Sequence, residues 1–248
     1  MTAIITGASS GLGTEFVKAV SALMPEIDDF WLVARRKDRL DMLLNNLGKP
    51  GCAVSCDISD KSGWDVLKAE LEAKKPDVKL LINCAGAGKM GDIADSDAET
   101  QTKMVALNAT GLTAVTTLVL PYMASGAKII NVSSISSFCP NARLTVYSAT
   151  KAYVSFFSRG LGLELKDKGI TVTAVCPGPM ETEFLGLAGI KSKTFDRLPR
   201  TKPEFAAFGA VKAALRGKSV YTPRFFFKFY RVVAKILPQS LMIYLART

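Results

Sequence analysis

The stretch Thr6-Gly7-Ala8-Ser9-Ser10-Gly11-Leu12-Gly13 follows an apolar run, Thr2–Thr6, and leads into a helical pattern over Leu12–Leu23. At a glycine-rich turn between a strand and a helix, backbone N–H groups can approach a pyrophosphate at the helix N-terminus. A side chain at any of the three glycines would obstruct that approach. Glycine clusters also occur in ordinary turns, so the position at the first strand-to-helix junction is what indicates a dinucleotide site.

Short β-rich runs alternate with longer helical patterns along the rest of the chain. Because the strands are continuously apolar, the alternation predicts a parallel sheet covered by helices on both faces. We expect a doubly wound α/β fold of Rossmann type with about seven strands. The expected strands are Thr2–Thr6, Phe30–Ala34, Ala53–Cys56, Leu80–Asn83, Lys128–Val132, Thr171–Val175 and Ser219–Tyr221, and the expected helices are Leu12–Leu23, Lys37–Leu47, Gly63–Lys74, Asp97–Met123, Val146–Lys166 and Pro203–Leu215.

Two segments interrupt this alternation. Phe184–Lys202 holds two glycines, a proline and scattered charges, which predicts a mobile loop beside the substrate. The tail, residues 223–248, is aromatic and basic and predicts a C-terminal helical extension. No Pro/Gly/Ser-rich linker divides the chain, so we expect one domain over residues 1–248.

The composition excludes several function classes. The chain has no histidine, which rules out Ser-His-Asp hydrolases, Cys-His nucleophiles and histidine-ligated metals. The five cysteines show no Cys-x-x-Cys pair, so we expect no metal site and reduced thiols in a cytoplasmic protein. Met1 leads directly into a strand, so no signal peptide is expected, and no apolar run approaches the roughly 20 residues of a membrane span.

The formal net charge of +10 favours anionic partners. These could be a phosphorylated cofactor, an acidic carrier or a membrane surface, and an ordinary basic surface is the alternative. No motif that reads nucleic acid accompanies the charge, so no nucleic-acid partner is expected.

Among six tyrosines, Tyr147 alone has a lysine four residues on, at Lys151. Residues four apart share one face of a helix, so the phenol and the ammonium can lie side by side. A free tyrosine loses its proton near pH 10, and a fixed cation lowers that pKa. The pair is therefore a candidate acid/base unit, although Tyr and Lys at this spacing are often only surface neighbours.

Two arginines, Arg35 and Arg36, follow the expected second strand. A site that prefers NAD places Asp or Glu at this strand end to bind the ribose 2′-hydroxyl, and none is present here. Guanidinium groups form bidentate bonds with phosphate, so the pair predicts the 2′-phosphate of NADP(H). A basic surface turn is the alternative interpretation.

Taken together, these motifs resemble the single-domain short-chain dehydrogenase/reductase family over roughly Thr2 to Thr182. The pattern Thr-Gly-x-x-x-Gly-x-Gly matches Thr6 to Gly13, and Asn-x-Ala-Gly matches Asn83 to Gly86, with Cys84 where Asn is commoner. Ser134 lies thirteen residues before Tyr147, which is the family's usual spacing. The residues of Ser134–Lys166 and the apolar tail are similar to those of the lipid-directed branch, which includes 3-oxoacyl and hydroxysteroid reductases.

The resemblance implies a role for each matching residue. Ser134 would polarise the substrate oxygen, Tyr147 would exchange its proton, and Lys151 would lower the Tyr147 pKa and hold the nicotinamide ribose. Asn108 would support a water chain to Lys151, which gives the catalytic set Asn108, Ser134, Tyr147 and Lys151. With the two arginines, the cofactor-binding residues are Gly7, Ser9, Ser10, Gly11, Leu12, Gly13, Arg35, Arg36, Asp57, Ile58, Asn83, Ala85, Gly86, Tyr147, Lys151, Pro177, Gly178, Met180 and Thr182.

The expected function is NADP(H)-dependent hydride transfer to or from a carbonyl or secondary alcohol. The alternative is an NADPH-binding regulator or membrane-surface interaction protein on the same fold with little catalysis. An apolar acyl, lipid or steroid-like substrate is expected from the residues that would frame the pocket, and the family resemblance suggests a homodimer or homotetramer. Those framing residues are Phe138, Leu144, Met180, Phe184 and Leu187.

The tail has three competing interpretations. Lys228, Arg231 and Lys235 fall on one face of a helix whose other positions are almost wholly apolar. The segment could pack against the domain or a partner subunit, form a lid over an apolar substrate, or lie on a membrane surface as a basic amphipathic helix.

Overall fold

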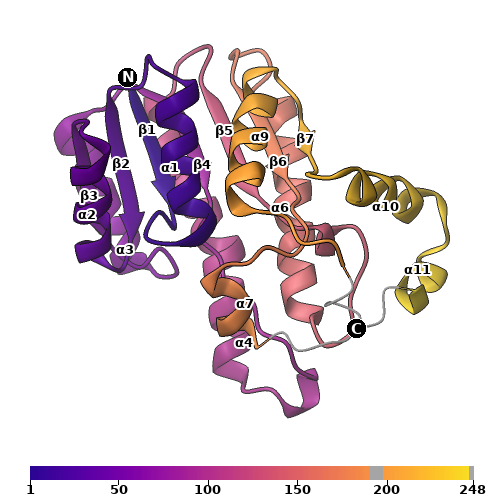
Figure 1. Cartoon of the computed structure of the whole chain (residues 1–248). Coiled ribbons are helices and arrows are strands. Elements are labelled where there is room, and N and C mark those ends of the chain that lie inside the picture. The colour runs from indigo at the N-terminus through magenta and orange to yellow at the C-terminus, as the bar shows by residue number, and fades with distance from the viewer. Residues whose placement is uncertain (190–197, 246–248) are drawn as a thin grey trace.

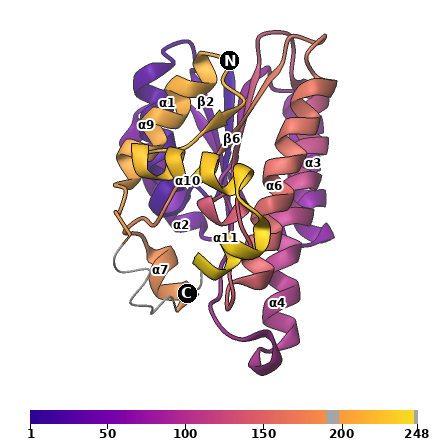
Figure 2. The same cartoon turned by 90° about the vertical axis from the view of Figure 1, so that its right-hand side faces the viewer.

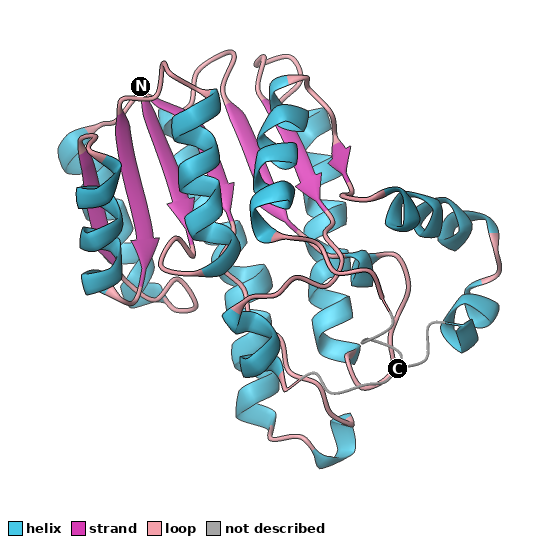
Figure 3. Ribbon diagram, in the orientation of Figure 1, coloured by secondary structure: helices cyan, strands magenta, loops and turns pink. Residues whose placement is uncertain are grey.

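A seven-stranded parallel sheet forms the centre of the molecule, in the order β3-β2-β1-β4-β5-β6-β7 (Figures 1 and 3). The computed structural model describes residues 1–189 and 198–245. The predicted doubly wound sheet is confirmed, with strand ends that differ from the expected ones by at most two residues. The strands are β1 (Thr2–Thr6), β2 (Asp29–Ala34), β3 (Gly51–Ser55), β4 (Val78–Asn83), β5 (Lys128–Val132), β6 (Thr171–Val175) and β7 (Val220–Tyr221).

Helices cover both faces of this sheet, as Figure 2 shows in a view along its edge. One face carries α1 (Gly11–Leu23), α2 (Lys37–Leu47) and α9 (Pro203–Leu215). The other carries α3 (Lys61–Lys74), α5 (Leu112–Val119) and α6 (Thr145–Glu164). Both helical layers pack against buried strand residues, which is the burial expected for strands without polar alternation.

The contact between α1 and α9 depends on small side chains. On α9, Ala206, Ala207 and Ala210 are fully buried and pack in one core with Phe16 and Val17 of α1. Alanine at these positions lets the two helices lie close together over the sheet. This packing holds the N-terminal end of α1, where the glycine-rich turn lies, at a fixed position beside the sheet.

The long helix after β4 is not uniform. The single helix predicted over Asp97–Met123 is divided into α4 (Ala98–Val105), a π turn η2 (Ala106–Gly111), α5 and a 3₁₀ turn η3 (Leu120–Tyr122). A Cβ atom at Gly111 would lie 2.4 Å from the carbonyl oxygen of Ile58, so the helix passes directly over the chain after β3. Such π turns often occur at functional sites, and this one carries Asn108.

The same stretch corrects one expectation from the sequence. In the described residues, the run Ala98–Tyr122 is long and apolar enough, by length and composition, to cross a membrane. Threonine, glycine and asparagine residues interrupt its apolar side chains, so the sequence shows no unbroken apolar run of this length. The run is nevertheless packed against β4, α3 and α6, as the core helix of an α/β domain is.

The expected substrate loop contains regular structure. A short helix, α7 (Glu183–Ala188), begins one residue before that segment, and Met180 forms an isolated parallel bridge with Thr201. Residues 190–197 lie outside the described part of the chain, so the predicted mobility of the loop stays a prediction. The tail forms the predicted helices, α10 (Phe225–Ile236) and α11 (Gln239–Leu245), which extend beyond the sheet edge at β7 (Figure 1).

Candidate active site

A cleft of about 480 Å³ opens at the carboxyl ends of the central strands, where the strand order reverses between β1 and β4. This switch point is where open α/β sheets bind ligands. All the predicted site residues line the cleft except Asn83 and Asn108. The lining residues that were predicted are Gly7, Ser9, Ser10, Gly11, Leu12, Gly13, Arg35, Arg36, Asp57, Ile58, Ala85, Gly86, Ser134, Tyr147, Lys151, Pro177, Gly178, Met180 and Thr182.

The glycine-rich turn is shaped by the protein's own backbone as well as by the space a ligand needs. Gly7 has a φ of 69°, and a Cβ atom there would lie 2.8 Å from the backbone of Ala85. A Cβ atom at Gly13 would lie 2.0 Å from the carbonyl oxygen of Gly7. Both glycines are therefore required for β1, α1 and the turn after β4 to fit together.

The first turn of α1 suits an anion. Ser10 is the N-cap residue, its side chain makes no capping hydrogen bond, and no acidic residue lies in the first turn. The first N–H groups of the helix therefore keep their capacity to donate to a phosphate. This arrangement fits the pyrophosphate of a dinucleotide.

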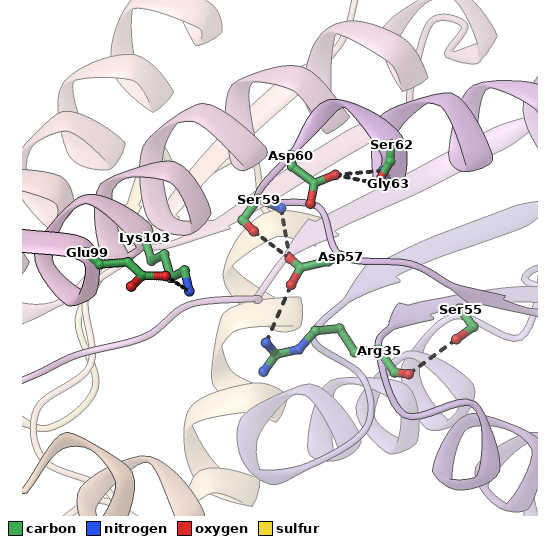
Figure 4. Close-up of polar contacts among 9 residues, drawn as sticks. All are labelled: Arg35, Ser55, Asp57, Ser59, Asp60, Ser62, Gly63, Glu99 and Lys103. Atoms are coloured by element: carbon green, nitrogen blue, oxygen red, sulfur yellow. Dashed lines mark hydrogen bonds and ion pairs between the residues drawn. The ribbon is translucent and has the colours of Figure 1, made fainter.

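The two arginines lie at the end of the cleft beyond β2, in different environments. Arg35 is 75% exposed and its Nη1 lies 3.4 Å from Oδ2 of Asp57, whose other oxygen accepts hydrogen bonds from Ser59 (Figure 4). Arg36 donates to Oγ of Ser9 at 3.1 and 3.3 Å, and forms an ion pair with Glu183 at 3.2 Å. Arg35 is therefore the less constrained of the two cations.

Asn83 does not line the cleft, contrary to the prediction. Its Nδ2 donates to Oγ1 of Thr116 and to Oδ1 of Asn131, each at 2.9 Å, and the side chain is buried. Its side chain points to the face of the sheet that carries α5, while the next residues, Cys84 to Gly86, line the cleft. In this structure Asn83 joins β4 to β5 and α5.

Asn108 lies behind the cleft wall. Its side chain exchanges two hydrogen bonds of 2.8 Å with the backbone of Ala87 and donates to Oγ1 of Thr150 at 3.0 Å. A Cβ atom at Gly86 would lie 3.2 Å from both Oδ1 of Asn108 and Nζ of Lys151. Asn108 thus holds the β4 turn next to the lysine rather than facing a ligand directly.

Ser134, Tyr147 and Lys151 lie on one wall of the cleft. Ser134 follows β5 and accepts a hydrogen bond from the backbone of Ser136 at 3.1 Å. Tyr147 and Lys151 come from the first half of α6, and Nζ of Lys151 lies 5.7 Å from the centre of the Tyr147 ring. The predicted pair is therefore brought together on one helix face.

The titration of the pair differs from the prediction. Loss of hydration raises the pKa of Tyr147 to about 12, and a hydrogen bond with Ser134 opposes this only in part. Burial also lowers the pKa of Lys151 to about 8. The ammonium of Lys151 donates to the carbonyl of Val132 at 3.0 Å. A raised pKa keeps the proton on the Tyr147 hydroxyl at neutral pH, which suits a proton donor.

Sequence reasoning missed several residues that line the cleft. Glu183 forms ion pairs with Arg36 and Arg39, and Leu107 reaches the cleft from the π turn. Phe184 was expected only as part of the apolar substrate region, yet its ring lies 5.7 Å from that of Tyr147. The register of α7 over the cleft carries no local sequence signal, so these contacts could not be found beforehand.

The chain belongs to the short-chain dehydrogenase family, an oxidoreductase family, because residues 1–190 match the family model described as short chain dehydrogenase. This membership fits the sheet order and the cleft described above. The family resemblance inferred from the motifs is thus confirmed.

Curated relatives and solved structures agree with this assignment. The chain is 31% identical over 94% of its length to a very-long-chain 3-oxoacyl-CoA reductase from Bos taurus, of which 73% is covered. It is 34% identical over 74% of its length to a serine 3-dehydrogenase from Agrobacterium fabrum, again covering 73%. A short-chain dehydrogenase from Sphingobium yanoikuyae in complex with NADPH has a TM-score of 0.80 and 29% identity, covering 96% of this chain and 97% of that one.

Proposed function

We propose that this protein is an NADP(H)-dependent oxidoreductase that transfers a hydride to or from a carbonyl or secondary alcohol of an apolar substrate. The observation that carries the proposal is the convergence of Ser134, Tyr147 and Lys151 on one wall of a cleft whose other end holds an uncapped helix N-terminus. A protein that only bound a nucleotide would have no use for a serine, a tyrosine and a lysine together beside the cofactor.

A bound nicotinamide would supply or accept the hydride. The side chains of the chain would control position and protons. Ser134 donates a hydrogen bond to the substrate oxygen, and Tyr147 gives that oxygen its phenolic proton as the carbonyl carbon is reduced. In the reverse direction Tyr147 takes the proton from the alcohol, and a charged Lys151 nearby favours the phenolate that this step needs.

The preference for NADP(H) is supported by Arg35 and Arg36 at the end of β2. No acidic residue occupies the strand end, where a carboxylate would bind the ribose 2′-hydroxyl of NAD. The Sphingobium structure holds NADPH and a similar serine dehydrogenase holds NADP+, although a similar 3-ketoacyl-(acyl-carrier-protein) reductase from Brucella melitensis holds NADH.

Replacing Arg35 by alanine should weaken the binding of NADPH about 10- to 100-fold and leave that of NADH nearly unchanged. The reason is the loss of a charge-assisted contact with the 2′-phosphate, typically about 1.5–3 kcal/mol. Isothermal titration calorimetry with NADPH and with NADH measures the two affinities. Lys37→Ala is the matched control, since Lys37 carries the same charge two residues after Arg35 but pairs with Asp41 at 2.7 Å and does not line the cleft. Equal losses for the two nucleotides would place the 2′-phosphate elsewhere.

An apolar substrate is supported by the walls around Tyr147. Leu144, Met180 and Phe184 line the cleft there, together with Leu185. Phe138 does not line it, because its ring packs against Tyr230 of α10. The side chain of Leu187 lies outside the described part of the structure. Similarity to a very-long-chain 3-oxoacyl-CoA reductase over nearly the whole chain agrees with an acyl or other lipid-like substrate.

Oxidation of NADPH against a panel of carbonyl compounds tests the proposal. The panel should include 3-oxoacyl thioesters of short and long chain, oxosteroids and small polar ketones, each followed at 340 nm. We expect turnover with apolar members and a kcat/KM that rises with the length of the acyl chain. Turnover confined to small polar ketones would contradict the substrate class, and no turnover with any member in either direction would contradict the reaction.

A further inference from the structure

Helix α10 has an inner face that is anchored to the body of the protein. Phe227 is buried, and a Cβ atom at Gly178 would lie 2.2 Å from its ring, so the ring sits directly on that glycine. Tyr230, one turn further on, packs its ring 6.1 Å from that of Phe138. Both contacts are made to the chain segments that follow β5 and β6, so α10 has a fixed orientation on the domain.

The outer face of α10 is an exposed apolar stripe. Phe225, Phe229, Val232 and Ile236 are 82%, 60%, 49% and 74% exposed. Their spacing of four, three and four residues places them on one side of the helix, opposite Phe227. Helix α11 continues the apolar surface with exposed Leu241, Ile243 and Tyr244, while Met242 is buried. We call Phe225, Phe229, Val232 and Ile236 the outer stripe.

Cations accompany the outer stripe, and carboxylates are absent from this part of the sequence. Lys228 and Lys235 are exposed and lie along one border of the stripe, and Arg224 precedes the helix. The sequence from residue 205 to residue 248 contains no aspartate or glutamate. An apolar helix face bordered by lysines fits a surface that is apolar below and negatively charged above.

We propose that α10 and α11 dock the protein on the surface of an anionic lipid bilayer, with the outer stripe inserted among the acyl chains and the lysines beside the phosphates. Amphipathic helices with aromatic residues on one side and lysines beside them bind membranes in this way. This interaction goes beyond the proposed oxidoreductase activity and does not rest on it.

Two other occupants of the outer stripe are less compatible with the structure. A substrate lid would turn its apolar face toward the cleft, whereas the face of α10 opposite the outer stripe is the one that contacts the domain. A second copy packed stripe against stripe would bring the lysines of two helices together, and neither helix has a carboxylate to pair with them. A bilayer with anionic headgroups would bury the apolar side chains of the outer stripe and pair the lysines with phosphates.

Flotation of the full-length protein with vesicles tests the proposal, using phosphatidylcholine alone and phosphatidylcholine with about 30% phosphatidylglycerol. The native protein should float with the anionic vesicles, and more weakly at high salt because the charge contribution is screened. Phe229→Glu should weaken the partition at least about tenfold, since burying one phenylalanine contributes on this order. Lys228→Glu with Lys235→Glu should have an effect of similar size on anionic vesicles only.

Matched variants separate docking from general effects on the surface. Phe205→Glu alters an exposed phenylalanine on α9, which is 57% exposed against 60% for Phe229, and should leave flotation unchanged. The double variant Lys166→Glu with Lys168→Glu, on the turn after α6, changes the net charge as much as Lys228→Glu with Lys235→Glu does. It should also leave flotation unchanged. Circular dichroism and thermal melting confirm that each variant is folded.

The proposal is overturned if the native protein floats with neither kind of vesicle. It is also overturned if Phe205→Glu reduces flotation as much as Phe229→Glu. A dimer in sedimentation experiments that Phe229→Glu dissociates, without vesicle binding, would instead show that the outer stripe is an interface between copies of the chain.

Discussion

Replacing Tyr147 by phenylalanine should lower the rate of NADPH oxidation by about 10²–10⁴-fold, the usual contribution of a positioned proton donor. The substitution removes only the hydroxyl and keeps the ring, whose centre lies 5.7 Å from that of Phe184. NADPH affinity, measured by fluorescence titration, should therefore change little. Single-turnover experiments should show that the loss lies in the chemical step, because binding is preserved.

Tyr153→Phe is the matched control, because it makes the same change on the same helix, less than two turns further on. The hydroxyl of Tyr153 lies 2.7 Å from Oγ1 of Thr113, and its ring stacks on that of Phe157, at a partly exposed place that does not line the cleft. This variant should keep nearly full turnover. Retained turnover in Tyr147→Phe would mean that the proton comes from another group.

Gly13→Ala should be the most damaging of the substitutions that add a single methyl group in the cofactor site. A Cβ atom there would lie 2.0 Å from the carbonyl oxygen of Gly7, which is backbone and cannot rotate away. The turn must move, and we expect the free energy of unfolding to fall by about 1–3 kcal/mol, the usual cost of overpacking. NADPH should bind at least about tenfold more weakly, since a lost hydrogen bond to the pyrophosphate is on this scale. Urea denaturation and nucleotide titration measure the two effects.

Gly160→Ala provides the comparison for a helical glycine. Gly160 is exposed in α6, and among the residues that the structure describes none lies within 4 Å of the place a Cβ atom would take. Alanine there should stabilise the protein by about 0.5–1 kcal/mol, because glycine loses more conformational freedom on folding. Equal stability changes at the two positions would show that the contact with Gly7 is not what constrains the turn.

The fold was largely predictable because each element carries its own local signal. The β1 run, the glycine-rich turn and the start of α1 lie together in the sequence, and their order repeats a strand-to-helix pattern. For the same reason the sequence predicted that Tyr147 and Lys151 lie together, since residues four apart share a helix face. The division of the central helix by a π turn was not predictable, because it depends on the contact of Gly111 with Ile58, which lies more than fifty residues earlier in the chain on the same face of the sheet.

The pKa shift of Tyr147 could not be predicted from the sequence either. The spacing of Tyr147 and Lys151 predicted a lowered pKa for the phenol, but loss of hydration dominates and raises it to about 12. Lys151 donates instead to Val132 on a strand distant in sequence. Burial and the direction of a hydrogen bond belong to the surroundings of a group, and no spacing in the chain encodes them.

The sequence by itself determined the class of fold, the position of the glycine-rich turn and the pairing of Tyr147 with Lys151 on one helix face, because periodicity, glycine placement and helical spacing act between near neighbours. Only the tertiary structure decided that Asn83 bonds to Thr116 and Asn131, that Phe184 of α7 packs on Tyr147, and that α10 turns Phe227 inward and the outer stripe to the solvent. These outcomes depend on contacts between segments far apart in the chain, and such contacts exist only once the sheet has assembled.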